Sequence, residues 1–90
     1  MTHVIKRLKD HVEPYDHHKL ASSIKASCLT VRTPIGEAEL TAQRVCMDIL
    51  EWLEDRIEVT SADVRRKASE CLQTYNPEAA YMYEQHDYLA

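Results

Sequence analysis

Over most of the chain, hydrophobic residues recur every three or four positions. This period runs through residues 17–30, 37–55 and 61–74, and it is typical of helices that bury one face. The second segment is the longest and has the broadest apolar stripe, so we expect it to be the spine of a helical bundle. The residues of that stripe are Ala38, Ala42, Val45, Ile49 and Trp52 or Leu53, widened by Cys46 and Leu50.

The other helices have narrower apolar faces. The first face consists of Leu20, Ile24, Cys28 and Val31. The face of the third helix consists of Val64, Ala68, Cys71, Leu72 and Tyr75. In a fourth helix, which starts near Pro77, we expect Ala79, Ala80 and Tyr83 to point inward, with Tyr88 as a further candidate.

Polar residues and prolines predict where these helices begin and end. Asp16 precedes the first helix as an N-cap, and Thr60 with Asp63 approximates a capping box for the third. Pro77 suits the first position of the fourth helix, so we expect the residue before it, Asn76, to be the N-cap of that helix. Residues 32–36, which contain Pro34 and the only glycine, break the chain between the first two helices.

The first fifteen residues predict a β-hairpin. Residues 4–8 form one strand, residues 9–11 a turn and residues 12–15 the return strand. Pro14 has no N–H to donate, so it suits an edge or a strand end. Residues 57–59 are long enough for a third strand, but three residues do not show where that strand pairs.

Composition predicts one domain, residues 1–90, of an ordinary globular kind. The net charge of −4 argues against generic nucleic-acid binding. Residues 1–32 hold six Lys or Arg against three acids (+3), whereas residues 33–90 hold five against twelve (−7). A small polyanion is therefore attracted to the N-terminal part. Three scattered cysteines and the absence of an apolar leader or span predict a cytoplasmic protein without membrane contact.

The sequence signals no catalytic machinery. A single glycine rules out a glycine-rich phosphate loop, and no nucleophile and base have a recognisable spacing. His17 and His18 are adjacent, so on a helix they point about 100° apart and do not form an i,i+4 metal-ligand pair. We therefore expect no enzyme activity and no metal site. The function that remains open is the binding of an anion by several cationic side chains together with the free N–H groups at helix starts.

Several short motifs occur in an order that resembles a known family. They are Lys6-Arg7, Val12-Glu13, Tyr15-Asp16, Lys19-Leu20, Val59-Thr60-Ser61 and the run from Asn76 to Tyr83. Together they resemble the ATP-cone, the regulatory nucleotide-binding domain at the front of ribonucleotide reductases and in the zinc-ribbon repressor of reductase genes. The resemblance implies an α+β fold, a four-helix bundle capped by the N-terminal hairpin with a short third strand beside it.

The resemblance also implies a ligand and a site. The ligand is ATP or dATP, with Mg²⁺, bound as an effector and not as a substrate. The implied partner is ribonucleotide reductase or another larger protein, and a homo-oligomer is a further option. The positions that match phosphate-holding residues are Lys6, Arg7, Lys19 and Thr60. Glu13 and Asp16 match residues near the sugar or base, and Val4 and Leu20 match residues that line the base pocket.

Two departures from the family pattern leave an alternative open. The family reads Lys-Arg-Asp-Gly at the hairpin turn, whereas this chain reads Lys6-Arg7-Leu8-Lys9-Asp10-His11, without the glycine and with a turn one residue longer. After Tyr83 the chain has no Lys or Arg, whereas the family often has a basic residue there. The alternative is a degenerate cone that acts as a protein-interaction or oligomerisation module without binding nucleotide. Preference between ATP and dATP, the number of nucleotides, and whether the chain is free-standing or a first domain all stay open.

Overall fold

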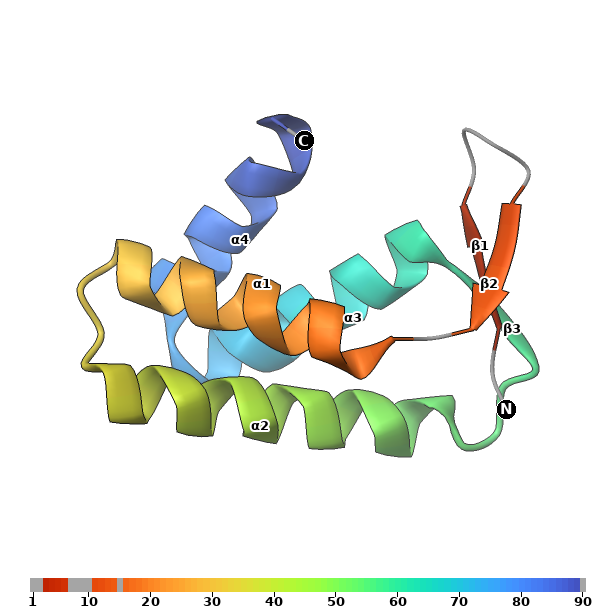
Figure 1. Cartoon of the computed structure of the whole chain (residues 1–90), viewed down its shortest axis with the longest axis horizontal. Coiled ribbons are helices and arrows are strands. Elements are labelled where there is room, and N and C mark those ends of the chain that lie inside the picture. The colour runs from red at the N-terminus through yellow and green to blue at the C-terminus, as the bar shows by residue number, and fades with distance from the viewer. Residues whose placement is uncertain (1–2, 7–10, 15, 90) are drawn as a thin grey trace.

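The protein is a helical bundle with a small sheet at one end (Figure 1). The computed structural model describes the backbone of residues 3–6, 11–14 and 16–89 and the side chains of residues 16–85. In chain order the elements are β1 (His3–Lys6), β2 (His11–Pro14), α1 (His17–Thr30), α2 (Ile35–Leu53), β3 (Glu58–Thr60), α3 (Ser61–Tyr75) and α4 (Pro77–Leu89). Helix α2 packs against α1 and α3, and α4 packs against the same two helices. The predicted α+β class and the predicted bundle of four helices are therefore confirmed.

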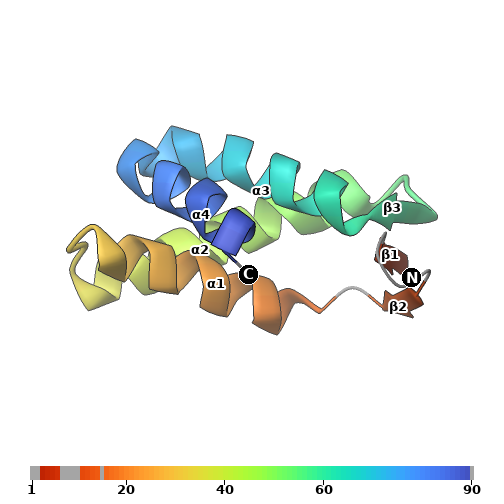
Figure 2. The same ribbon diagram turned by 90° about the horizontal axis from the view of Figure 1, so that it is seen from above.

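The sheet brings the N-terminal strands β1 and β2 together with β3, which lies far from them in the sequence. Its strand order is β2-β1-β3, with β1 antiparallel to β2 and parallel to β3. Pro14 is the last residue of the edge strand β2, a position that suits a residue without an N–H. The predicted third strand therefore does lie beside the hairpin. Helices α1 and α3 both begin at the sheet end of the molecule, as two views at right angles show (Figures 1 and 2).

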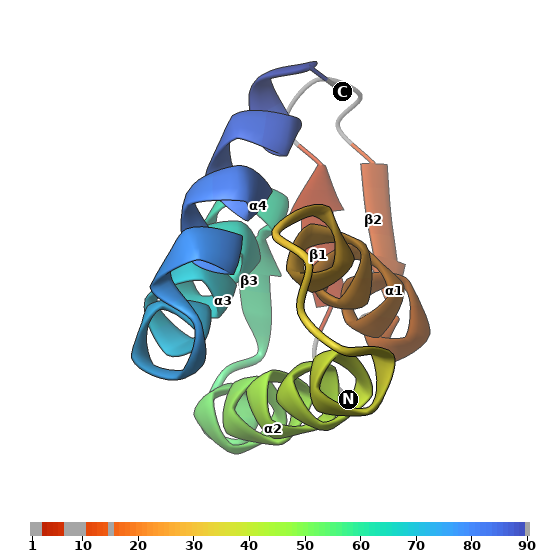
Figure 3. The same cartoon turned by 90° about the vertical axis from the view of Figure 1, so that its left-hand side faces the viewer.

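The core lies between the four helices, seen end-on in Figure 3. Ile24, Ile49 and Leu72 are fully buried there. Each such side chain contributes about 1.5–3 kcal/mol by leaving water. The predicted inward residues of α4 are confirmed for Ala79, Ala80 and Tyr83, whereas the side chain of Tyr88 is outside the described part.

Two predictions about the core were wrong, and one buried residue, Ser69, was not predicted. Leu50 is 47% exposed, because it lies about 100° round α2 from Ile49, beyond the arc that α1 and α3 cover. Tyr75 is 38% exposed at the end of α3, where its hydroxyl donates to Asp48 Oδ2 at 2.8 Å. Ser69 is buried instead, and its hydroxyl donates to Glu84 Oε1 at 2.6 Å.

The connection between α1 and α2 differs from the predicted break. Arg32 adopts the left-handed conformation, with φ 63°, while Gly36 lies in the first turn of α2. The N–H of Arg32 bonds to the Leu29 carbonyl and the N–H of Thr33 to the Cys28 carbonyl, both at 3.0 Å, which is a Schellman motif. Helix α2 starts at Ile35, two residues earlier than predicted, because Pro34 is its N-cap and the Pro34 carbonyl accepts the first helical hydrogen bond, from the Ala38 N–H at 2.9 Å.

The other element boundaries shift by one or two residues. Helix α2 ends at Leu53, and not at Asp55, and α3 ends at Tyr75. Strand β3 begins at Glu58, so Ile57 precedes it and is 82% exposed. Strand β2 starts at His11, which was predicted in the turn, and strand β1 covers His3–Lys6. The predicted positions of residues 7–10 and 15 lie outside the described residues. No helix in the described part of the chain is long and apolar enough to cross a membrane.

Candidate functional site

The start of α1 is capped by Asp16, as predicted. Its Oδ1 accepts hydrogen bonds from the backbone N–H of His18 at 3.0 Å and of Lys19 at 3.4 Å. The Asp16 side chain is exposed, and so is Lys19 in the first helical turn. A carboxylate therefore already occupies the anion-binding position of this helix start.

The start of α3 is a complete capping box, which confirms the predicted pair. Thr60 Oγ1 accepts from the Asp63 N–H at 3.0 Å, and Asp63 Oδ2 accepts from the Thr60 N–H at 3.1 Å. The Arg66 guanidinium also donates to Asp63. The bonds from Thr60, first from its backbone and then from its side chain, hold the pKa of the Asp63 carboxyl below its usual value.

The pairing of β1 with β3 places two of the predicted phosphate-binding positions, Lys6 and Thr60, near each other along the sheet. Ile5 of β1 pairs with Thr60 of β3, so Lys6 follows immediately after the residue that lies beside the start of α3. Val4 pairs with Val59 on one side and with Glu13 on the other. For Val4, Lys6 and Glu13 the structure describes the backbone alone, and Arg7 lies outside the described residues.

The two predicted site residues on α1 have different surroundings. Lys19 is exposed at the sheet end of the molecule, where the first turn of α1 lies (Figure 2). Leu20 is only 7% exposed and belongs to the hydrophobic core. Lys6, Lys19 and Thr60 thus share one end of the fold. Both helix starts at this end carry a capping carboxylate, so the attraction for an anion has to come from the cationic side chains.

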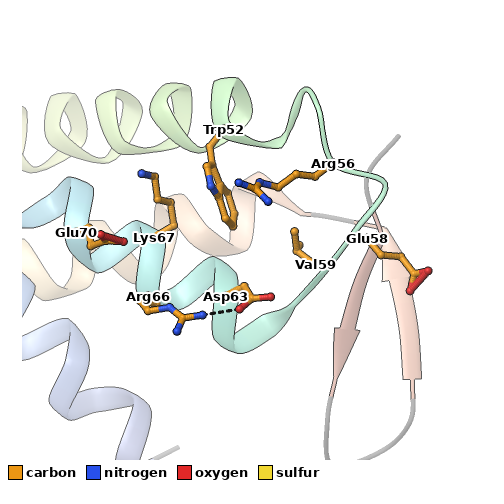
Figure 4. A pocket seen from close by; sticks show the side chains of 8 residues that line it. All are labelled: Trp52, Arg56, Glu58, Val59, Asp63, Arg66, Lys67 and Glu70. Atoms are coloured by element: carbon orange, nitrogen blue, oxygen red, sulfur yellow. Dashed lines mark hydrogen bonds and ion pairs between the residues drawn. The ribbon is translucent and has the colours of Figure 1, made fainter.

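A pocket of about 340 Å³ lies beside the start of α3 (Figure 4). It extends between the last turn of α2, strand β3 and the first three turns of α3. The Arg56 guanidinium carbon lies 4.5 Å from the centroid of the Trp52 ring, a cation–π contact. The lining residues are Trp52, Arg56, Glu58, Val59, Asp63, Arg66, Lys67 and Glu70.

The charges around this pocket balance. Three cations, Arg56, Arg66 and Lys67, face three acids in the lining, and Arg66 is already paired with Asp63. Pocket volume is within the range for small ligands, but a neutral lining does not favour a triphosphate. Sequence reasoning did not predict this pocket. The only signal was local, the i,i+4 spacing of Trp52 and Arg56 and the i,i+3 spacing of Asp63 and Arg66.

The three cysteines are free and lie buried or half-buried, and the adjacent histidines at the start of α1 stack on each other. Cys28 and Cys46 are buried and free, and burial raises the pKa of each thiol. Burial also raises the pKa of the half-buried Cys71 thiol, so all three stay protonated at neutral pH. His17 and His18 stack with their ring centroids 4.3 Å apart. Within the described residues, no three His, Cys, Asp or Glu side chains are grouped to hold a metal ion.

Comparison with known proteins gave no match: no family model, no curated protein and no solved structure is similar to this chain. The ATP-cone resemblance of the sequence motifs therefore stays a prediction.

Proposed function

We propose that this domain binds ATP or dATP at its sheet end as an effector. The observation that carries the proposal is the β1–β3 pairing of Ile5 with Thr60, which brings the strand that leads into Lys6-Arg7 beside the start of α3. Lys19, on the first turn of α1, lies at the same end. The identity of the ligand rests on the resemblance of the motifs to the ATP-cone.

The phosphates would be held mainly by side-chain cations. Asp16 and Asp63 cap the two helix starts, so Lys6, Arg7 and Lys19, together with Mg²⁺, have to offset the phosphate charge. The Thr60 hydroxyl accepts from the Asp63 N–H and also bonds to the Asp63 carboxyl, so it would donate to a phosphate oxygen only after its hydrogen turns away from that carboxyl. The sugar and base would lie toward Glu13, Val4 and Leu20.

The proposed output is regulation and not turnover. A bound nucleotide that contacts the sheet and both helix starts favours the arrangement in which these elements lie together. An effector acts only through such a difference in affinity between two states. The resemblance implies that the responding partner is ribonucleotide reductase or another larger protein.

Calorimetric titration of ATP and dATP, with Mg²⁺, into the folded domain tests this function. We expect saturable binding, weakened about tenfold or more when Lys6 and Arg7 are both replaced by alanine, because charged hydrogen bonds contribute about 1.5–3 kcal/mol each. The matched control is Lys25→Ala, since Lys25 lies farther along α1, bonded to Glu39 at 3.2 Å. It should bind like the wild type.

Two outcomes would overturn the proposal in different ways. No heat and no thermal shift with millimolar nucleotide would exclude nucleotide binding. Binding that survives the Lys6→Ala, Arg7→Ala double substitution but is lost in Lys67→Ala would instead move the nucleotide to the pocket beside Trp52. Circular dichroism on each variant shows whether the domain is folded.

A further inference from the structure

Three hydrogen-bond donors line the pocket beside Trp52. The Arg56 guanidinium and the Lys67 side chain lie on the two sides of the indole ring (Figure 4). The guanidinium, the ammonium and the indole N–H all donate and do not accept. Among the described residues, Lys67 forms no ion pair and the indole N–H of Trp52 has no acceptor. A ligand with acceptor atoms would therefore satisfy two donors that the folded chain leaves to solvent.

The acidic residues of the lining offset only part of the positive charge. Asp63 is already paired with Arg66. The Glu58 carboxylate points away from the other lining side chains (Figure 4). Glu70 remains, exposed and one turn along α3 from Lys67. The two cations that flank the indole ring, set against Glu70, leave one net positive charge, so the pocket suits a monoanion and not a polyanion.

An apolar surface lies next to these donors. Val59 is only 5% exposed and lines the pocket together with the half-buried ring of Trp52. The Arg56 guanidinium carbon is 4.5 Å from the centroid of that ring, and this cation–π contact holds the guanidinium in place for a ligand. The volume of about 340 Å³ is at the low end for small-ligand sites. The pocket therefore has room for a small flat group beside one anionic group.

We propose that this pocket binds a small organic carboxylate that carries a flat apolar group. The carboxylate accepts from Lys67 Nζ and from the Arg56 guanidinium, whose planar fork matches two carboxylate oxygens. The apolar group lies against Val59 and the indole ring. This site is separate from the proposed nucleotide site, because none of its cations belongs to Lys6, Arg7 or Lys19, and it does not depend on nucleotide binding.

Fluorescence of Trp52 tests the site directly, because Trp52 is the single tryptophan of the chain. The probe is phenylacetate, a flat ring with one carboxylate, and phenethyl alcohol is its neutral counterpart of similar shape. At constant ionic strength, phenylacetate should change the fluorescence saturably, with a dissociation constant of about 0.1–1 mM. Phenethyl alcohol should bind about tenfold more weakly or less, because it accepts no charge-assisted pair of bonds.

Lys67→Met removes the ammonium and keeps most of the apolar stem of the side chain. It should weaken phenylacetate binding about tenfold and leave the binding of phenethyl alcohol unchanged, because only the charged hydrogen bond is lost. A purely structural role of Lys67 would affect both probes equally. The matched control is Lys25→Met on α1, where Lys25 is bonded to Glu39 at 3.2 Å, and it should bind phenylacetate like the wild type.

Three results would overturn the proposal. They are no saturable change with up to about 10 mM phenylacetate, equal binding of phenethyl alcohol, and wild-type affinity in Lys67→Met. Displacement of phenylacetate by ATP would also overturn it, because the pocket would then belong to the nucleotide site. Phenylacetate binding by a domain that binds no nucleotide would support this pocket and refute the proposed function, so the two failures are distinguishable.

Discussion

At the scale of single residues, a few polar side chains decide where the helices begin and end. Asp16 caps α1, Thr60 and Asp63 cap α3, and Asn76 Oδ1 accepts from the Ala79 N–H at 3.2 Å to cap α4. Each of these was readable from the sequence, because a cap is a local signal of residue type and spacing. The Asn76 amide also donates to Thr33 Oγ1 at 2.9 Å. That contact joins residues 43 positions apart, and no local pattern predicts it.

Replacing Arg32 by glycine should stabilise the protein. Arg32 ends the Schellman motif after α1 with φ 63°, a conformation that costs an L-residue about 1 kcal/mol and glycine much less. We expect the free energy of unfolding to rise by about 0.5–1 kcal/mol, measured by urea denaturation. A loss of stability would mean that the Arg32 side chain makes a compensating contact.

Replacing Asp63 by asparagine should change how stability depends on pH. The folded-state pKa of Asp63 is lower than its unfolded value, so its stabilisation is fully present above the unfolded pKa and is lost as pH falls through the folded pKa. The difference in unfolding free energy between wild type and Asp63→Asn should therefore be larger at pH 7 than near pH 3. Thermal unfolding across this range measures it, and a difference that does not vary with pH would contradict the assignment.

At the scale of whole elements, apolar periodicity predicted the helices and most of their buried faces. A 3.6-residue period is a property of local sequence, so Ala38, Val45 and Ile49 were recognised without knowledge of their neighbours. Periodicity does not say how wide an arc the neighbouring helices cover. That is why Leu50, at the edge of the arc, was predicted to be buried and is exposed.

Two alanine substitutions in α2 should have very different effects. Ile49 is fully buried, so Ile49→Ala should cost about 2–5 kcal/mol through lost burial and the cavity that remains. Met47 lies two residues earlier and is 68% exposed, so Met47→Ala should change stability by no more than about 0.5 kcal/mol in dilute solution. Urea denaturation at low protein concentration compares them, and similar losses would mean that α2 is rotated from the orientation described.

At the scale of the whole molecule, the pairing of β1 with β3 organises the candidate site. Ile5 and Thr60 are adjacent in the sheet although 55 positions separate them in the sequence. Three extended residues carry too little pattern to reveal such a pairing, so it was implied by the family resemblance alone. The pocket beside Trp52 was missed because it arises only when α2, β3 and α3 come together. Its lining residues look like ordinary surface charges in the sequence.

The central claim is that a nucleotide binds where the sheet meets the starts of α1 and α3. Backbone amide chemical shifts, followed by NMR while ATP and Mg²⁺ are added, test it most directly. The account predicts saturable shifts concentrated at Lys6, Lys19 and Thr60, with little change at the opposite end around Thr33 and Asn76. Shifts confined to that opposite end, or none at millimolar ATP, would contradict it.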